Sequence, residues 1–201
     1  LADGPIIQRA SQIAIGNGVN IKWILEAVKE IRASSEIPLV LMGYINPIIK
    51  YGLVKFMKDC QMAGVDGIII PDLPLEEAEK FVQLAKENNI SPILLVAPNT
   101  SSRRIKIISD LAGDLIYCVA ILGITGSSEH DMGNLASYLE RVKENSSCPF
   151  IVGFGIKTRK DVKKINELAH GAVVGSGIIN AIDESVCPVD TVKNYIESLL
   201  K

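Results

Sequence analysis

Short apolar runs alternate with amphipathic stretches from one end of the chain to the other. The runs have the length of β-strands and are continuously apolar, a pattern typical of parallel strands buried on both faces of a sheet. They predict six strands, at residues 38–42, 67–70, 92–96, 115–119, 150–152 and 172–174. The other stretches predict helices at residues 20–33, 53–63, 75–88, 101–112, 135–144 and 160–169, with a further helix opening at 178.

Residue types at the ends of these stretches support the assignment. Asn88 and Asn89 are expected to end one helix, and Thr158 or Asp161 to cap another. In the helix at 20–33, Trp23 shares an apolar stripe with residues at helical spacing. We therefore expect Trp23 to pack in the interior.

The alternation predicts a single α/β domain over residues 1–201, because no linker, low-complexity tract or change of composition interrupts it. Six βα units fit either an open, doubly wound sheet or most of a TIM (β/α)8 barrel, whose usual length is about 250 residues. The chain is about 50 residues shorter than such a barrel, and a helix precedes its first predicted strand. We therefore expect the domain to be N-terminally incomplete, with Leu1 inside a longer product.

Composition narrows the function classes. Of 201 residues, 48% are hydrophobic and 22% charged, with a net charge of -2, as expected for one globular domain with an ample core. No basic excess points to nucleic acid, and the basic spots at 103–106 and 157–164 are interpreted as solvated helix faces. No apolar run approaches the roughly 20 residues of a membrane span.

The cysteines and histidines indicate no metal site. The cysteines, which lack any Cys-x-x-Cys pair, are Cys60, Cys118, Cys148 and Cys187. Their wide spacing favours reduced, mostly buried thiols in a cytosol-like compartment over a disulfide framework or a zinc site. The two histidines are far apart in the sequence, so we predict no metal ligands.

Two glycine turns indicate a phosphate site. Gly175-Ser176-Gly177 follows an apolar run and opens a helical pattern, and Gly153-Phe154-Gly155 stands one unit upstream. Glycines let the backbone approach an anion, Ser176 is expected to cap the helix, and first-turn N–H groups point at the ligand. Either turn alone is explained equally well by tight packing, but loops after the last two strands of β/α barrels commonly bind phosphate.

Several motifs, in order, resemble the tryptophan synthase alpha subunit family along the whole chain. They are Leu-Ala-Asp-Gly-Pro (1–5), Leu-Met-Gly-Tyr-Ile-Asn-Pro (41–47), Gly-Val-Asp-Gly (64–67) leading to Pro-Asp-Leu-Pro (71–74), Gly-Ile-Thr-Gly (123–126), Gly-Phe-Gly-Ile (153–156) and Gly-Ser (175–176). The resemblance implies a (β/α)8 barrel of which this chain holds strands 3 to 8. It also implies a carbon–carbon lyase of tryptophan biosynthesis that cleaves indole-3-glycerol phosphate to indole and glyceraldehyde 3-phosphate.

The same resemblance implies a partner and a compartment. In the family, a pyridoxal-phosphate-dependent beta subunit receives the indole within an alpha2beta2 complex, and the alpha subunit itself carries no cofactor. The expected location is the cytoplasm, or the plastid stroma if the protein is organellar. Residues matching the partner interface are Asn46, Pro47 and Pro74.

Site residues follow from the resemblance position by position. Asp3 matches the aspartate that hydrogen-bonds the indole nitrogen and stabilises positive charge on the ring. Thr125 matches the threonine of a closing loop. The remaining matches are substrate-binding residues: Tyr44, Tyr117, Gly126, Phe154, Gly155, Gly175 and Ser176.

The family's acid/base glutamate falls upstream of Leu1, so that role is assigned to no residue here, and we expect the 201-residue chain to be inactive alone. The sequence departs from the family pattern at two places in the expected closing loop. Ile121-Leu122 precedes the Gly-Ile-Thr-Gly motif, and residues 127–130 lack the arginine often found there in the family. His130 is expected in an exposed loop.

Two alternatives stay open. One is another phosphate-binding barrel enzyme, of the indole-glycerol-phosphate synthase or ribulose-phosphate epimerase type, since glycine cradles are widely shared. The motifs Leu-Ala-Asp-Gly-Pro and Pro-Asp-Leu-Pro favour the resemblance to the tryptophan synthase alpha subunit over this alternative. The other alternative is a non-catalytic barrel module that docks on the beta subunit.

Overall fold

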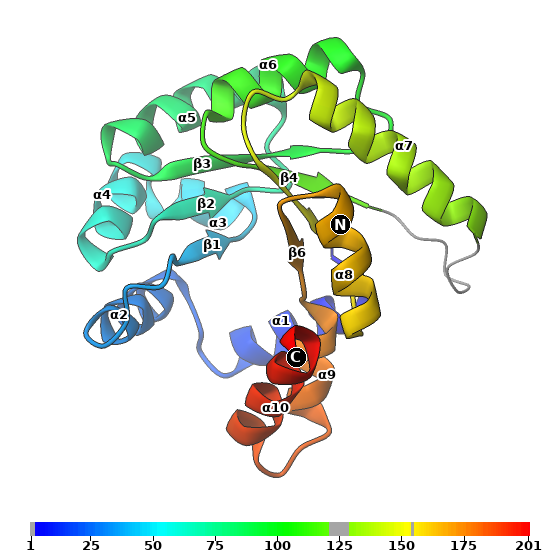
Figure 1. Cartoon of the computed structure of the whole chain (residues 1–201). Coiled ribbons are helices and arrows are strands. Elements are labelled where there is room, and N and C mark those ends of the chain that lie inside the picture. The colour runs from blue at the N-terminus through cyan, green and yellow to red at the C-terminus, as the bar shows by residue number, and fades with distance from the viewer. Residues whose placement is uncertain (1–2, 121–128, 154) are drawn as a thin grey trace.

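Six parallel strands form one curled sheet in the computed structural model, which describes residues 3–120, 129–153 and 155–201 (Figure 1). The strands are β1 (Val40–Met42), β2 (Gly67–Ile69), β3 (Ser91–Val96), β4 (Ile116–Val119), β5 (Phe150–Gly153) and β6 (Gly171–Val173). Each pairs in parallel with the next strand along the chain. All six predicted strands are confirmed, with small differences at their ends.

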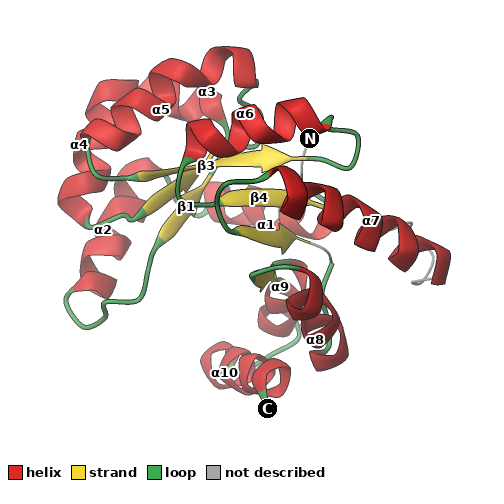
Figure 2. Cartoon of the chain, turned by 45° about the horizontal axis from the view of Figure 1, so that its top comes forward, coloured by secondary structure: helices red, strands yellow, loops and turns green. Residues whose placement is uncertain are grey.

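The strand order decides between the two architectures left open by the sequence. A doubly wound sheet reverses its strand order at a switch point, where helices change faces. The order β1-β2-β3-β4-β5-β6 has no such reversal. Helices α4 to α7 follow the outer, convex side of the sheet (Figure 2), which is the arrangement of a β/α barrel arc.

The described helices occupy the predicted stretches and a few more. They are α1 (Pro5–Gly16), α2 (Ile21–Arg32), α3 (Ile45–Tyr51), α4 (Leu53–Ala63), the 3-10 helix η1 (Leu75–Glu77), α5 (Ala78–Glu87), α6 (Ser102–Ala112), α7 (Glu129–Asn145), α8 (Arg159–Leu168), α9 (Ser176–Asp183) and α10 (Pro188–Leu200). Asn88 ends α5, followed by Asn89 at φ 55°. Thr158 and Asp161 together form the capping box of α8.

Two expectations about helices are wrong. The stretch 75–88 divides into η1 and α5, and His130 lies in α7 rather than in a loop. Asn46 and Pro47 lie in the first turn of α3, where proline is tolerated because its missing N–H needs no intrahelical partner.

Side chains alternate between the two faces of the sheet. Ile116 and Cys118 of β4, like Phe150 and Val152 of β5, are buried against the outer helices. Tyr117 and its cross-strand neighbour Ile151 point the other way and are only half-buried. At the β1 end, Val40 and Met42 are 43% and 50% exposed. The concave side of the arc is therefore open there.

Trp23 does not pack in the interior. Its side chain is 58% exposed, whereas Leu25 and Val28 form the buried face of α2. Two residues subtend roughly 200° around a helix, so Trp23 and Leu25 lie on nearly opposite sides. The apolar stripe identified in the sequence was therefore centred on the wrong face.

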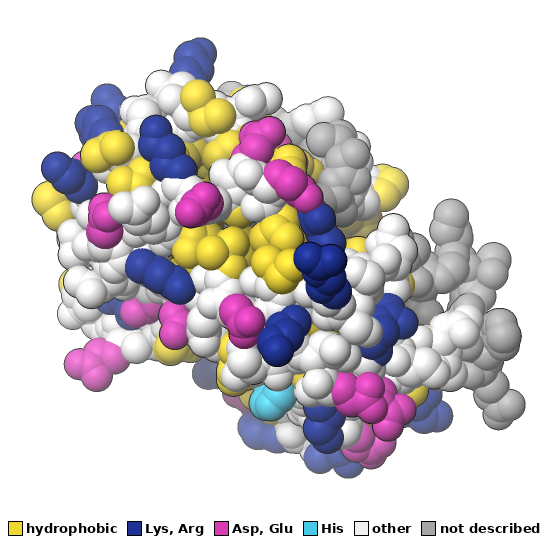
Figure 3. Space-filling view, turned by 90° about the horizontal axis from the view of Figure 1, so that it is seen from above, with side chains coloured by type: hydrophobic (Ala, Val, Ile, Leu, Met, Phe, Trp, Pro, Cys, Tyr) yellow, Lys and Arg dark blue, Asp and Glu magenta, His cyan; other side chains and the backbone are white. Residues whose placement is uncertain are grey.

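The surface charges, the helices and the cysteines match what the composition predicts. On the face drawn in Figure 3, Lys and Arg side chains are interspersed with Asp and Glu around small apolar areas. None of the helices in the described ranges has the length and apolar character that crossing a membrane requires. Cys60, Cys118 and Cys148 are buried free thiols and Cys187 is exposed, which confirms the expectation of mostly buried, unpaired cysteines.

Candidate active site

Asp3 and Tyr44 come together although 41 positions separate them. Asp3 precedes α1, and Tyr44 connects β1 to α3. The Tyr44 hydroxyl donates a hydrogen bond of 2.7 Å to Asp3 Oδ2. The backbone carbonyl of Asp3 accepts a second bond, 2.6 Å long, from Gln8 Nε2. The aspartate is thus held through both its side chain and its backbone, at the carboxyl end of β1.

Tyr117 stands next to this pair on β4. Burial, and to a smaller extent the charge of Asp3, raise the pKa of the Tyr117 hydroxyl, which therefore remains protonated. Its oxygen lies over Gly153 at the end of β5, where an added Cβ would be only 1.9 Å away. The structure therefore brings together three predicted residues, two tyrosines and one carboxylate, beside Gly153.

The glycine turns present backbone amides where phosphate was predicted. Gly155 is exposed, with φ +56°, a conformation that favours glycine. Gly175 is the N-cap of α9, and the amides of Ile178 and Ile179 donate to its carbonyl at 3.0 and 3.2 Å. The amides of Ser176 and Gly177 come before the first helical hydrogen bond and point out of the N-terminal end of α9.

Ser176 does not cap α9 with its side chain, so that prediction is wrong. Gly175 takes the N-cap position, and no side-chain hydrogen bond caps the helix there. Ser176 is the first helical residue, one position too late for capping. Its hydroxyl is consequently left for other partners.

Helix α1 joins the aspartate to the glycine turn at α9. A Cβ on Gly175 would lie 3.6 Å from Ile7 Cδ1, and Arg9 forms an ion pair with Asp183 at the other end of α9. Ile7 lies in the first turn of α1, four residues after Asp3. Through α1, the Asp3 carboxylate, a hydrogen-bond acceptor, is linked to the first-turn amides of α9, which suit an anion.

Three predicted residues, Thr125, Gly126 and Phe154, lie outside the described residues. In the sequence they stand between β4 and α7 and directly after β5. The described members of the predicted substrate-binding set lie within a strand, after a strand or at the start of a helix. Tyr117 is within β4, Ser176 begins α9, and the residues that follow strands are Tyr44, Gly155 and Gly175. The carboxyl ends of the strands, which these last three residues follow, are where β/α barrels build their sites.

The predicted interface residues also share one surface. Asn46, Pro47 and Pro74 are all exposed. The Ile45 amide donates to Asp72 Oδ1 at 2.9 Å, which ties the start of α3 to the turn before η1. Sequence reasoning included Asp72 in a motif but gave it no role, because only the fold brings its carboxylate to the Ile45 amide.

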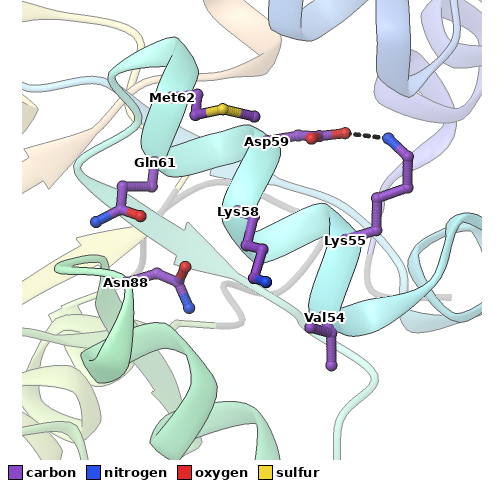
Figure 4. A pocket seen from close by; sticks show the side chains of 7 residues that line it. All are labelled: Val54, Lys55, Lys58, Asp59, Gln61, Met62 and Asn88. Carbon is purple, nitrogen blue, oxygen red and sulfur yellow. Dashed lines mark hydrogen bonds and ion pairs between the residues drawn. The ribbon is translucent and has the colours of Figure 1, made fainter.

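Two surface pockets lie at different distances from the candidate site. The larger, of about 620 Å³, lies on α4 and is lined by Val54, Lys58, Met62 and neighbouring side chains (Figure 4). The smaller, of about 330 Å³, lies at the carboxyl ends of β2 to β4 and includes Pro74 and Thr100 in its lining. The smaller pocket borders the interface surface, whereas the larger lies on the outer helical layer.

No additional acid or metal site stands out within the ranges the structure covers. Glu76 forms a bidentate pair with Arg104, at 2.6 and 3.1 Å, which lowers the pKa of Glu76 to about 2. A carboxyl held ionised in this way is unsuited to act as an acid. Across the same described residues, no group of three or more His, Cys, Asp or Glu is arranged to hold a metal ion.

Comparison with known proteins identifies the same family as the sequence motifs. The family model described as tryptophan synthase alpha chain matches residues 1–199. The alpha chain of Petrotoga mobilis is 49% identical over 185 residues, which cover 92% of this chain and 72% of the relative. That of Prosthecochloris aestuarii is 44% identical, with 94% and 74% covered.

Solved structures share the fold. A mutant alpha subunit from Pyrococcus furiosus superposes with a TM-score of 0.90 at 35% identity, covering 99% of this chain and 81% of its own. The alpha subunit of Legionella pneumophila gives 0.89 at 32% identity, with 98% and 75% covered. A structure of the a2b2 complex of Pyrococcus furiosus gives 0.89 at 35% identity, with 100% and 81% covered. With its motifs, its sheet and these relatives in agreement, the chain belongs to the tryptophan synthase alpha chain family.

Proposed function

We propose that the complete protein cleaves indole-3-glycerol phosphate to indole and glyceraldehyde 3-phosphate, the lyase reaction of its family in tryptophan biosynthesis. The observation that carries the proposal is the hydrogen bond from Tyr44 to Asp3 beside Tyr117. It presents a fixed carboxylate at the strand ends, where the substrate's indole ring would lie.

Asp3 acts on the ring nitrogen. Breaking the bond between indole C3 and the glycerol chain is a retro-aldol step, which begins with protonation of C3 and places positive charge on the ring. The carboxylate of Asp3 accepts the indole N–H and stabilises that charge. Tyr44 occupies Oδ2, which orients the group, while Tyr117 and Phe154 line the indole pocket.

The anionic end of the substrate is bound by backbone amides. Gly155, Gly175 and Ser176, with Gly126 from the loop after β4, form the phosphate cradle. The free first-turn amides of α9 suit a dianion, because they carry the positive end of the helix dipole. Thr125 clasps Asp3 when the loop closes and excludes water from the reaction.

The barrel is completed by two further βα units that precede Leu1 in the complete protein. Residues 1–201 then form one barrel domain with strands 3 to 8. Support comes from β1 and β6, the two end strands of the described arc, from the exposure of Val40 and Met42, and from relatives of which the chain covers about three quarters. The acid/base glutamate comes from the added segment.

The proposed partner is the tryptophan synthase beta subunit, which holds the pyridoxal phosphate and takes up the indole. Asn46, Pro47 and Pro74 form the contact surface on this chain, next to the active site. The alpha chain needs no cofactor of its own for the cleavage. The reaction takes place in the cytoplasm, or in the plastid stroma in an organellar protein.

A lyase assay tests the proposal. We expect no measurable cleavage of indole-3-glycerol phosphate by the 201-residue chain, and restored cleavage when the missing N-terminal quarter of the Petrotoga mobilis alpha chain is fused before Leu1. Robust cleavage by the 201-residue chain contradicts the need for the added segment. A fusion that binds the beta subunit but never cleaves substrate favours a non-catalytic docking module instead.

A further inference from the structure

Tyr195 of α10 lies across both turns of the phosphate cradle. Its hydroxyl donates a hydrogen bond of 3.1 Å to the Lys157 carbonyl, two residues after Gly155. The same oxygen would be 2.2 Å from a Cβ on Gly177, the residue after Ser176. One side chain from the C-terminal helix therefore contacts the turn after β5 and the first turn of α9 at once.

The Lys157 peptide is held from both sides. Its N–H donates to Asp161 Oδ2 at 3.2 Å, and its carbonyl accepts from Tyr195. The side chain of Ile156, just before it, is buried. The segment that follows Gly155 is thus fixed by three contacts, while Gly155 itself stays exposed.

Gly177 leaves the space that the tyrosine fills. Besides the hydroxyl, Tyr195 Cζ would be 3.0 Å from a Cβ at this position, so any side chain would displace the ring. Burial, and to a smaller extent the charge of Asp161, raise the pKa of the Tyr195 hydroxyl. The group therefore stays protonated and remains a donor to Lys157.

We propose that Tyr195 is a positioning residue for the substrate's phosphate, which holds the two glycine turns at the separation where their amides converge on one anion. The inference rests on the phosphate cradle of the proposed function. A pre-positioned set of donors binds an anion more tightly, because less ordering remains to be done on binding. Tyr195 itself does not touch the phosphate.

Titration calorimetry of the 201-residue chain with inorganic phosphate, and separately with indole, tests this role. We expect Tyr195→Phe to raise the Kd for phosphate by about three- to ten-fold, the effect of one neutral hydrogen bond, and to leave the Kd for indole unchanged. Tyr51→Phe is the matched control, since its hydroxyl donates to Asp59 in the outer helical layer. It should change neither affinity.

Gly177→Ala provides a second, independent variant. Its methyl group should displace the Tyr195 ring and weaken phosphate binding in the same way, and the loss should be smaller when Tyr195→Phe is already present. Thermal unfolding of each variant shows whether it is folded. Unchanged phosphate affinity in Tyr195→Phe, or equal weakening of phosphate and indole, overturns the positioning role alone. Failure of the unmodified chain to bind phosphate overturns the cradle, and the role of Tyr195 with it.

Discussion

The Tyr117 hydroxyl occupies the space that a side chain at Gly153 would fill. A Cβ on Gly153 would lie 1.9 Å from this oxygen and 2.6 Å from Tyr117 Cζ. Gly153 pairs with Val119 in the parallel register of β4 and β5, so the tyrosine two residues earlier reaches diagonally across the strands. The first glycine of the Gly-Phe-Gly motif therefore serves packing, whereas Gly155 belongs to the proposed phosphate cradle.

Gly153→Ala should disturb the indole end of the site. The methyl group forces Tyr117 out of its position and should lower the free energy of unfolding by about 1 to 3 kcal/mol, as overpacking does. Indole affinity should fall, because the pocket wall moves. Chemical denaturation and indole titration measure the two effects, and an alanine variant with native stability and affinity would show that Tyr117 relaxes without cost.

Asp3→Asn should separate binding from catalysis in the completed barrel. The amide keeps the shape of the carboxylate but removes the charge that stabilises the protonated ring, so turnover should fall about 100-fold or more. Substrate should still bind. Tyr44→Phe removes the orienting hydrogen bond of 2.7 Å but leaves the charge of Asp3, and should cost less. Near-normal turnover in Asp3→Asn would refute the assigned role.

The strands were predictable because each is a short, continuously apolar run of strand length between breakers. The face of α2 was not. Its apolar residues extend around more than one side, and packing against α3 and α4 decides that Leu25 and Val28 are buried while Trp23 is exposed.

The site was predictable where a motif marks it and unpredictable where distant segments meet. Asp3 and Gly175 stand in recognisable motifs. The contact of Tyr195 with Lys157, 38 positions away, has no local signal. The sequence shows a glycine at position 177. It does not show that a side chain there would collide with the Tyr195 ring, because that contact depends on how α10 packs on α9.

Arg32→Lys should destabilise the fold. The Arg32 guanidinium donates to the carbonyls of Gly64 at 2.7 Å and Ile37 at 2.6 Å and pairs with Asp66, joining the end of α2 to the turns around β1 and β2. A lysine lacks this planar fork, so the free energy of unfolding should fall by about 2 kcal/mol. Arg103→Lys, on the exposed side of α6, should change it by less than about 0.5 kcal/mol. Equal denaturation midpoints for the two variants would contradict this role.

Only Cys187 should react with a thiol reagent such as Ellman's reagent at pH 8. Burial raises the pKa of Cys60 and Cys118 to about 12, so both stay protonated and shielded, and Cys148 is buried as well. Unfolding in guanidinium should release all four thiols. Rapid reaction of a second thiol in the native chain would show that the core opens at that cysteine.

Substitutions on the contact surface should weaken partner binding without abolishing the slow isolated reaction. Asn46 and Pro74 are exposed on neighbouring segments that the Ile45 to Asp72 hydrogen bond holds together. Bulky charged residues there, as in Asn46→Lys combined with Pro74→Glu, would be buried against the beta subunit at a desolvation cost. In the completed protein, affinity for the beta subunit should fall at least about ten-fold.

Lys58→Glu is the matched control, because Lys58 lies on the outer surface of α4 and also changes a charge. It should leave partner affinity unaltered. The proposed contact surface and the proposed active site share the carboxyl ends of the strands, so partner binding can favour the active conformation of the site. The double variant should therefore also lose activation by the partner. Unchanged affinity in a titration with the beta subunit would refute the docking surface, and equal loss of the isolated activity would assign Asn46 and Pro74 a structural role.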